Sequence, residues 1–203
     1  ETNQTYPHSY QVWRPQFDQL LLENSRASGV DVREGHRVRE IIFDANNAGG
    51  NRVAGVTYED AAGHQRVANT SLVVDASGQG GLVGRQLGLR SWDSFFQNLA
   101  VYGYFTGSQR LPAPAENNIF IEAYSQGWLW NIPLHNGWAS VGAVVDSAIG
   151  QRGIQQSSAK NYLLQQIAQA PGMSQLLNNA EMVAGPTLVR DWSYVCQPMV
   201  GDG

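Results

Sequence analysis

The sequence predicts a mixed chain (α+β / α/β) in which a large antiparallel sheet with helices follows a smaller part that contains a three-strand sheet. Three observations support this prediction. Residues 37–68 contain three strand-like runs separated by turns, and the runs are polar on one face. Residues 71–75 form one continuous apolar run that ends in an acid, which is typical of a parallel strand buried on both faces. Residues 99–145 contain about four further strand-like runs whose spacing predicts a meander, and helical spacing returns at 157–170.

The first part of the chain begins with a helix expected over residues 15–28. Pro15 suits the first helical position, leucines recur at helical spacing, and Gly29 is a suitable C-terminal cap. Short strands are expected on either side of this helix, at 10–13 and 30–33. The strands of the small sheet are expected at residues 37–44, 52–59 and 64–68.

A tight glycine turn follows the buried run, and residues 82–87 are then expected to form a helix that Gly88 ends. In the second part, Pro171 is expected to end the helix at 157–170, and a short helix is expected at 174–178. The strands of the second part are expected at residues 99–105, 118–124, 128–133, 138–145, 181–189 and 192–197. The predicted domains are residues 1–88, residues 89–197, and a tail at 198–203 that returns toward the first domain.

The composition of the chain excludes several classes of function. The net charge is −4 and Lys160 is the only lysine, so the clustered basic surface that nucleic acids require is not expected. No apolar run approaches the roughly 20 residues that span a bilayer, and the polar start of the chain lacks the pattern of a signal peptide. We therefore expect a cytoplasmic protein. The four histidines show no metal-ligand spacing and Cys196 is the only cysteine, so no metal site is expected.

The most informative stretch is the strand expected at residues 128–133, which read W-L-W-N-I-P. Alternate residues of a strand share a face, so Trp128, Trp130 and Ile132 are expected on one side of the sheet. Pro133 cannot donate to a sheet ladder and marks the end of the strand or a sheet edge. Two indoles on one face could line a pocket for a flat substrate, or they could belong to the core. The spacing leaves both alternatives open.

Two other features are candidate sites. The strand–turn–helix at 71–88 offers backbone N–H groups at a helix N-terminus, which favour phosphate, and glycines that allow a ligand close to the backbone. Its glycines, Gly78, Gly80 and Gly84, miss the dinucleotide fingerprint by one residue, so the alternatives are a turn that contacts a cofactor held mainly elsewhere and a purely structural turn. Glu122 lies in an apolar strand, where it is either an acid/base group near the indoles or a solvated residue.

Taken together, these segments resemble the flavin-dependent halogenases. Residues 128–133 match the W-x-W-x-I-P signature of that family. Residues 10–21 resemble the Y-x-V-x-R-x-x-F-D-x-x-L segment that halogenases share with related reductases and monooxygenases, and residues 73–78 resemble their second flavin-contacting motif. Residues 140–145 and 190–194 follow in the order found in the family. The resemblance spans nearly the whole chain and implies part of a group-A flavoprotein monooxygenase-like fold, with an FAD-binding domain at 1–88 and a substrate-binding domain at 89–197.

The resemblance also implies roles for individual residues. Arg14 would approach the pyrophosphate or ribityl chain of FAD, and the turn of Asp75, Ala76, Ser77 and Gly78 would lie along the same cofactor. The substrate or oxidant pocket would be lined by Trp128, Trp130, Ile132 and Pro133. In the family, reduced FAD (FADH2) from a separate flavin reductase reacts with O₂ and halide, and hypohalous acid halogenates an electron-rich small aromatic substrate, either free or tethered to a carrier protein.

The sequence departs from the family pattern in three ways. Neither the opening G-x-G-x-x-G segment nor the later G-D-A segment that grips the flavin is present, and the catalytic lysine of the family lies upstream of this region. Lys160, on the surface of a predicted helix, is a poor substitute, so we assign no catalytic residue and expect an internal fragment that alone neither binds FAD tightly nor halogenates. The alternatives are an FAD-dependent hydroxylase or geranylgeranyl reductase-like oxidoreductase, and a non-catalytic binding module with an aromatic-walled sheet.

Overall fold

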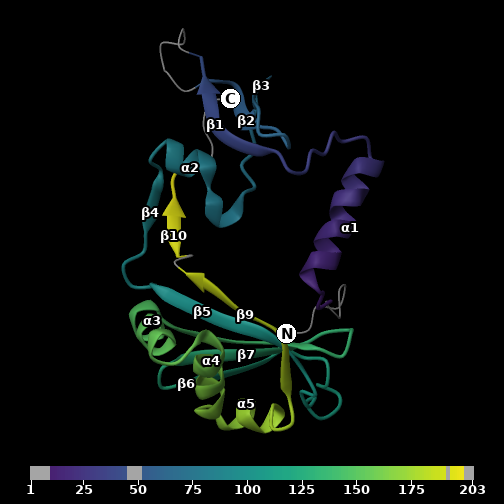
Figure 1. Ribbon diagram of the computed structural model, residues 1–203, viewed down its shortest axis with the longest axis vertical. Coiled ribbons are helices and arrows are strands. Elements are labelled where there is room, and N and C mark those ends of the chain that lie inside the picture. Colours follow the sequence, from purple (N-terminus) through teal and green to yellow (C-terminus); the bar gives the residue numbers. More distant parts are fainter. Residues whose placement is uncertain (1–9, 45–51, 191–192, 199–203) are drawn as a thin grey trace. The chain divides into compact units, whose positions relative to one another are not determined.

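The computed structural model describes residues 10–44, 52–190 and 193–198, and the chain forms two compact units (Figure 1). One unit comprises residues 1–23 and 95–192, and the other comprises residues 24–94 and 193–203. Helix α1 (Arg14–Ala27) contributes residues to both units. The expected turn at 45–51 and the end of the chain at 199–203 lie outside the described residues. The assignment of 1–88 and 89–197 to separate functional domains stays a prediction.

The first unit is built on an antiparallel sheet of five strands, which confirms the prediction of a large antiparallel sheet. Its strand order is β6-β7-β8-β5-β9. The strands are β5 (Asn98–Thr106), β6 (Phe120–Tyr124), β7 (Gly127–Pro133), β8 (Ala139–Asp146) and β9 (Glu181–Arg190). The arrangement differs from a simple meander, because β5 pairs with β8 and β9 instead of with β6, the next strand in the chain.

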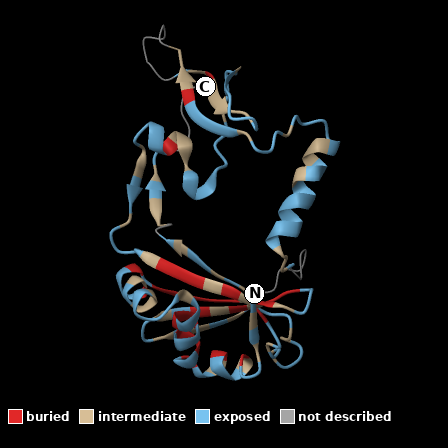
Figure 2. Cartoon of the chain, in the orientation of Figure 1, coloured by how far each residue is buried: buried red, intermediate tan, exposed pale blue. Residues whose placement is uncertain are grey.

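Three helices cover one face of this sheet (Figure 1). They are α3 (Ser147–Gln156), α4 (Ala159–Ala168) and α5 (Pro171–Leu176). The alternate residues of the central strands that point to the helices are fully buried, and they form one core with Leu163 of α4 and Met173 of α5. Figure 2 shows that the buried residues concentrate in this sheet and its helices. We call the other face of the sheet, which these three helices do not cover, the open face.

Two of the helices differ from the prediction. The sequence analysis missed α3, because Gly150 and Gly153 weaken the helical pattern. Both glycines are required by close packing: a Cβ at Gly150 would lie 2.5 Å from a methyl carbon of Leu99, and one at Gly153 would lie 2.2 Å from the ring of Tyr162. Pro171 does not only end the preceding helix. It also occupies the first position of α5, where its missing N–H costs no hydrogen bond.

The second unit contains the predicted three-strand sheet, with strands β1 (Arg37–Phe43), β2 (Val53–Glu59) and β3 (Gln65–Asn69) in that order. A short 3-10 turn (Gly78–Gly80) precedes helix α2 (Leu82–Gln86), which confirms the predicted helix. The side-chain amide of Gln86 both accepts from and donates to the backbone of Ile41, at 2.7 and 2.8 Å, and so joins α2 to the edge of β1. A two-stranded ribbon of β4 (Arg90–Trp92) and β10 (Tyr194–Cys196) completes the unit.

The run at residues 71–75 is not a strand, which corrects the prediction of a buried parallel strand. Leu72 and Val74 are 68% and 80% exposed. A parallel strand exists only when a neighbouring strand accepts and donates its backbone hydrogen bonds, and the described residues provide none for this run. The short strands expected at 10–13 and 30–33 are absent for the same reason.

Helix α1 confirms the prediction for residues 15–28 within one residue at each end. Gly29 has a φ of +88°, and its N–H and that of Val30 donate to the carbonyls of Arg26 and Ser25, which closes the helix as its glycine predicts. No residue of α1 is buried, as its pale-blue colour in Figure 2 reflects. None of the described helices is long and apolar enough to cross a bilayer.

Candidate functional site

Strand β7 places its two indoles together on the open face of the five-stranded sheet. Leu129 and Asn131 point to the helices and are 0% and 4% exposed. Trp128, by contrast, is 40% exposed and Trp130 is half-buried, and their ring centroids lie 5.8 Å apart. This confirms the predicted alternation along the strand. Of the two alternatives left open by the spacing, the core reading is wrong for these indoles, because the core lies on the other face.

The two indoles are the end of a longer row of rings, which we call the aromatic wall. Neighbouring rings in this row approach at centroid distances of 5.8, 6.0, 6.4, 6.0 and 6.1 Å, mostly with tilted or edge-on planes. Such arrangements suit the quadrupoles of aromatic rings. In order, the aromatic wall consists of Trp128, Trp130, Tyr102, Tyr104, Trp138 and Trp13.

The indole of Trp130 packs on the backbone of the neighbouring strand, β8. It pairs across the sheet with Gly142, and a Cβ at Gly142 would lie 2.3 Å from the indole, so the ring rests directly on the backbone of β8. The indole N–H donates to the Ser140 hydroxyl at 3.3 Å. Because its ring is supported and its only donor has an acceptor, Trp130 presents a fixed apolar surface.

The tyrosines supply the polar atoms of the aromatic wall. Tyr102 and Tyr104 come from alternate positions of β5 and stand beside β8, on the same face as the indoles. Burial, with a smaller contribution from Tyr102, raises the pKa of the Tyr104 hydroxyl, so this group keeps its proton at neutral pH. The wall is therefore an uncharged surface with hydroxyl and indole N–H groups.

The last two residues of the expected pocket, Ile132 and Pro133, lie on opposite faces of the sheet. Ile132 is half-buried and follows the indoles on the open face, as predicted. Pro133 is buried at the end of β7, on the face that carries Leu129 and Asn131. With Asn131 and Leu176 it borders a small cavity of about 10 Å³, enough for no more than one water molecule. Pro133 therefore ends the strand, and its side chain does not extend the aromatic wall.

The Glu122 carboxylate, which the sequence leaves as an acid/base group or a solvated residue, contacts the start of a helix. Its carboxylate accepts hydrogen bonds from the backbone N–H groups of Gly172 and Met173, at 3.1 and 2.6 Å. These are N–H groups of the first turn of α5, so the carboxylate serves as a cap supplied by another element. Glu122 also lies on the helix-covered face, because the residue before it, Ile121, pairs with Trp130 on the open face.

In the second unit, Asp75 organises the glycine turn. Its carboxylate accepts from the Ser77 N–H at 3.0 Å, the Ser77 hydroxyl at 2.6 Å and the Val83 N–H at 2.8 Å. Burial works to raise the pKa of this carboxyl, but the hydrogen bonds from Ser77 and Val83 outweigh it and hold the pKa below its usual range. The Asp75 carboxylate thus bonds to groups of the turn and of the helix that follows it, and residues 76–78 of the turn are exposed to solvent.

The turn itself is open to a ligand. Ala76, Ser77 and Gly78 are exposed, Gly78 has a φ of +60°, and a Cβ at this glycine would meet nothing within 4 Å. A left-handed glycine with free space above it permits close approach to the backbone. An exposed left-handed glycine is common to both alternatives that the sequence leaves, a turn that contacts a cofactor and a purely structural turn.

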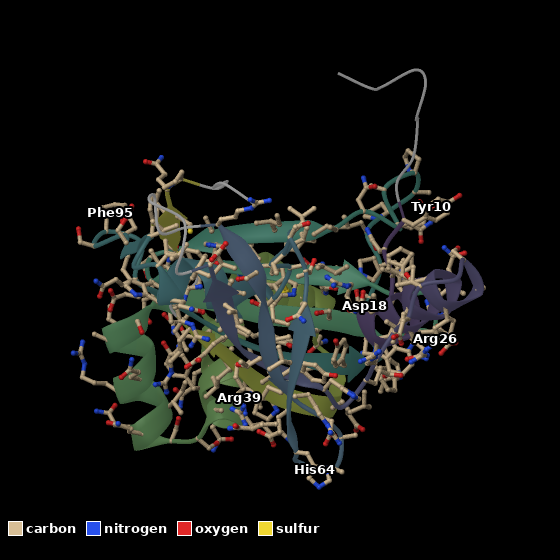
Figure 3. All side chains as sticks on the ribbon, turned by 90° about the horizontal axis from the view of Figure 1, so that it is seen from above. Tyr10, Asp18, Arg26, Arg39, His64 and Phe95 are labelled. Atoms are coloured by element: carbon tan, nitrogen blue, oxygen red, sulfur yellow. The ribbon has the colours of Figure 1, made fainter. Side chains whose placement is uncertain are left out.

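Arg14 is the first residue of α1, and its guanidinium forms two hydrogen bonds with Asp18, at 3.0 and 3.1 Å. Figure 3 labels Asp18 on this helix. The hydrogen bonds and charge of Asp18 raise the pKa of Arg14. Because 73% of the Arg14 side chain is exposed, its remaining N–H groups are accessible to an anionic ligand. Lys160, on α4, is exposed, as the sequence predicts.

Sequence reasoning missed most of the aromatic wall. Tyr102, Tyr104, Trp138 and Trp13 come from three segments that only the folded sheet brings together. The period-2 spacing of the tyrosines in β5 was a usable signal, equivalent to that of the indoles in β7. Nothing in the sequence predicts that Gly142 is the surface on which Trp130 rests. Among the described residues, no group of three or more His, Cys, Asp or Glu side chains could hold a metal ion.

Solved structures identify the class of protein to which this arrangement belongs. The myxobacterial chondrochloren halogenase CndH, an FAD-dependent halogenase, matches with a TM-score of 0.87 and 37% identity over 96% of this chain and 44% of its own. The flavin-dependent halogenase CmlS also matches with a TM-score of 0.87, at 30% identity over 97% of this chain and 34% of its own. The fold is that of flavin-dependent halogenases.

The sequence comparisons agree. The family model described as tryptophan halogenase matches residues 1–187, and this chain belongs to that family. The flavin-dependent halogenase armH4 of Armillaria mellea is 33% identical over 213 residues, which cover 96% of this chain and 40% of that protein. The chain thus spans about two fifths of the length of this relative. The resemblance seen in the sequence, the halogenase fold and the flavoprotein class are confirmed.

Proposed function

We propose that this chain forms the middle of an FAD-dependent halogenase that uses reduced FAD, O₂ and halide to halogenate an electron-rich aromatic substrate. The observation that carries the proposal is the aromatic wall. It contains both indoles of the W-x-W-x-I-P strand, in a chain whose residues 1–187 match the tryptophan halogenase family. The relatives with the strongest support are halogenases, which favours this activity over the hydroxylase, the reductase and the non-catalytic module.

FAD would be held in part by two elements of this chain. The exposed backbone of Ala76, Ser77 and Gly78 would lie along the cofactor, and Asp75 would keep that backbone in shape through its three hydrogen bonds. Arg14 would offer its accessible N–H groups to the phosphate or ribityl oxygens. When bound and reduced, FAD supplies the oxidising chemistry with O₂ that converts halide to hypohalous acid.

The aromatic wall would guide the substrate and exclude water. Its rings offer a flat apolar surface on which an aromatic ring can stack, and its few polar groups are uncharged. Since the Trp130 N–H already donates to Ser140 and the ring rests on Gly142, the wall does not rearrange to admit a ligand. A fixed dry surface keeps an oxidant from reacting with bulk water on its way to the substrate.

The finer features of the reaction follow from the same proposal. The substrate would be a small aromatic molecule, free or carried by a carrier protein, and a separate flavin reductase would supply the reduced cofactor. We also propose that the protein is cytoplasmic.

The test is an assay of the full-length protein that carries this sequence. Purified protein would be incubated with FAD, a flavin reductase, NADH, O₂ and either chloride or bromide, together with a panel of phenols, indoles and pyrroles. We expect a product whose mass spectrum shows the isotope pattern of the halide and that disappears when halide is left out. A hydroxylated product that forms without halide would support the monooxygenase alternative, and an absence of any flavin-dependent oxidation would refute the proposal.

A matched pair of variants connects the activity to the aromatic wall. Trp130→Ala removes the supported ring, whereas Trp128→Phe keeps an aromatic side chain at the exposed end of the row. We expect the first to lower the yield of halogenated product per reduced FAD consumed and the second to retain most of it. Equal yields from both variants and the unsubstituted protein would show that the aromatic wall plays no part in the reaction.

A further inference from the structure

We propose that Arg90 and Tyr194 are positioning residues that fix the backbone of the Asp75–Gly80 turn for FAD. The inference rests on the proposed function, because it assigns a purpose to a contact with the turn that would carry the cofactor. It concerns the two-stranded ribbon of β4 and β10, which lies outside the aromatic wall and shares only Tyr194 with the segments that resemble the halogenases. The ribbon reaches the turn through two hydrogen bonds to the backbone carbonyls of Gly78 and Gln79.

Both hydrogen bonds point to successive carbonyls of the turn. The Tyr194 hydroxyl donates to the Gly78 carbonyl at 3.1 Å. The Arg90 guanidinium donates through Nη2 to the Gln79 carbonyl at 2.6 Å. Asp75 binds the same turn from within, through Ser77 and Val83. The turn is therefore held from two directions, by the carboxylate inside it and by the ribbon beside it.

The two residues of the ribbon also hold each other. Tyr194 pairs across the ribbon with Trp92, and the Arg90 guanidinium lies over both rings, 3.9 Å from the centroid of Tyr194 and 5.2 Å from that of Trp92. The two rings meet edge to face at 5.5 Å. Stacking on the rings fixes the plane of the guanidinium, so that its N–H groups point at the turn. A lysine has no such plane and would not be oriented by the rings.

The end of the turn has a glycine where the Arg90 guanidinium approaches it. Gly81 has a φ of +47°, and a Cβ there would lie 2.6 Å from Nη2 and 3.2 Å from Cζ of Arg90. A side chain at this position would press on the guanidinium, which would have to shift from its contact with the Gln79 carbonyl. Gly78, in contrast, has open space above it. The turn thus has one side closed by Arg90 and another side free for a ligand.

The direction of the carbonyls decides which groups face that free side. In a planar trans peptide the C=O and N–H point in opposite directions. The Tyr194 hydroxyl fixes the Gly78 carbonyl toward the ribbon, so the N–H of Gln79 in the same peptide is directed away from it. An N–H donor that is fixed in advance binds an anionic or carbonyl oxygen without the entropic cost of ordering the turn. Arg90 and Tyr194 therefore act on FAD through the backbone and do not touch it.

The test measures FAD affinity and turn mobility in the full-length protein. Arg90→Ala should weaken FAD binding by at least about tenfold, because a hydrogen bond from a charged donor is lost. Arg90→Lys should behave like Arg90→Ala, because it keeps the charge without the stacked fork. Tyr194→Phe removes only the hydroxyl and should weaken binding by about threefold to tenfold. Arg66→Gln, which changes an arginine paired with Asp60 elsewhere in the same unit, is the matched control and should leave FAD binding unchanged.

Hydrogen exchange of the FAD-free protein supplies a readout that does not depend on the cofactor. Amides of residues 76–81 should exchange faster in Arg90→Ala and Tyr194→Phe than in the unsubstituted protein and the control, while those of the five-stranded sheet stay unchanged. If the variants bind FAD as the unsubstituted protein does, or if exchange in the turn is unaltered, the inference is wrong and the proposed function stands. If the unsubstituted protein fails to bind FAD, the proposed function is refuted, and the inference falls with it.

Discussion

The substitution Gly142→Ala tests whether the contact of Trp130 with the backbone of β8 fixes the aromatic wall. The new Cβ would lie 2.3 and 2.4 Å from two ring carbons of Trp130 and 2.6 Å from the Cβ of Tyr102. Carbon atoms pack at about 3.5–4.0 Å, so the indole must move by roughly 1 Å or more. The Cβ of Tyr102 is attached to the backbone of β5 and cannot rotate away. We expect a loss of about 1–3 kcal/mol in the free energy of unfolding, which is usual for overpacking.

The assay combines unfolding with circular dichroism of the FAD-free protein. Trp128 and Trp130 lie 5.8 Å apart at an interplanar angle of 48°, a geometry that gives an exciton couplet. A shifted Trp130 should change that couplet and lower the yield of halogenated product. Gly63→Ala is the control, because Gly63 has a φ of +84° and open space around it, so the variant loses stability through backbone strain alone. If Gly142→Ala keeps the couplet, the stability and the product yield of the unsubstituted protein, the reasoning is refuted.

Three further predictions concern single side chains. Ser140→Ala leaves the Trp130 N–H without its acceptor and should lower the unfolding free energy by about 0.5–1.5 kcal/mol, measured by denaturant titration; no change would mean that water replaces the hydroxyl. Glu122→Gln should lower thermal stability through the loss of charge at α5 yet leave kcat unchanged, whereas a fall in kcat at equal stability would restore the acid/base role. The pKa of Asp75 is lower in the folded protein, so its contribution to stability is complete above its usual pKa near 3.9 and is lost as the pH falls through the lower folded value. Protection of the turn's amides, corrected for the pH dependence of intrinsic exchange, should therefore fall at acid pH in the unsubstituted protein but not in Asp75→Asn, and parallel protection profiles would contradict this.

The sequence was sufficient to predict the faces of the strands, because a period of two is a local property. It placed Trp128 and Trp130 on one side of β7 and Leu129 on the other. It could not decide which side is the core, since that depends on where α3, α4 and α5 pack. For the same reason it left Glu122 as either an acid/base group near the indoles or a solvated residue, and did not predict that its carboxylate caps a helix on the opposite face. Register and layer order come from long-range pairing, which a single strand does not encode.

The failures at residues 71–75 and at α3 have different physical causes. The apolar run at 71–75 has the composition of a central parallel strand, but a strand is defined by partners, and the described residues offer none. In α3 the local propensity is low because of Gly150 and Gly153, and tertiary packing against Leu99 and Tyr162 compensates for it. The first prediction failed because apolar composition alone does not make a strand. The second failed because local helix propensity alone does not decide whether a helix forms.

The aromatic wall and the glycine turn are each held by residues that would not contact a ligand. Gly142 supports Trp130 in one unit, and Arg90 holds the carbonyl of Gln79 in the other, and the two share no partner. Their effects should therefore be independent: Gly142→Ala should lower product yield at unchanged FAD affinity, and Arg90→Ala should lower FAD affinity at unchanged yield per bound FAD. The free energy of FAD binding in the double variant should therefore equal that of Arg90→Ala to within about 0.3–0.5 kcal/mol. A larger coupling energy would mean that the wall and the turn act as one site, and that each is fixed partly through the other.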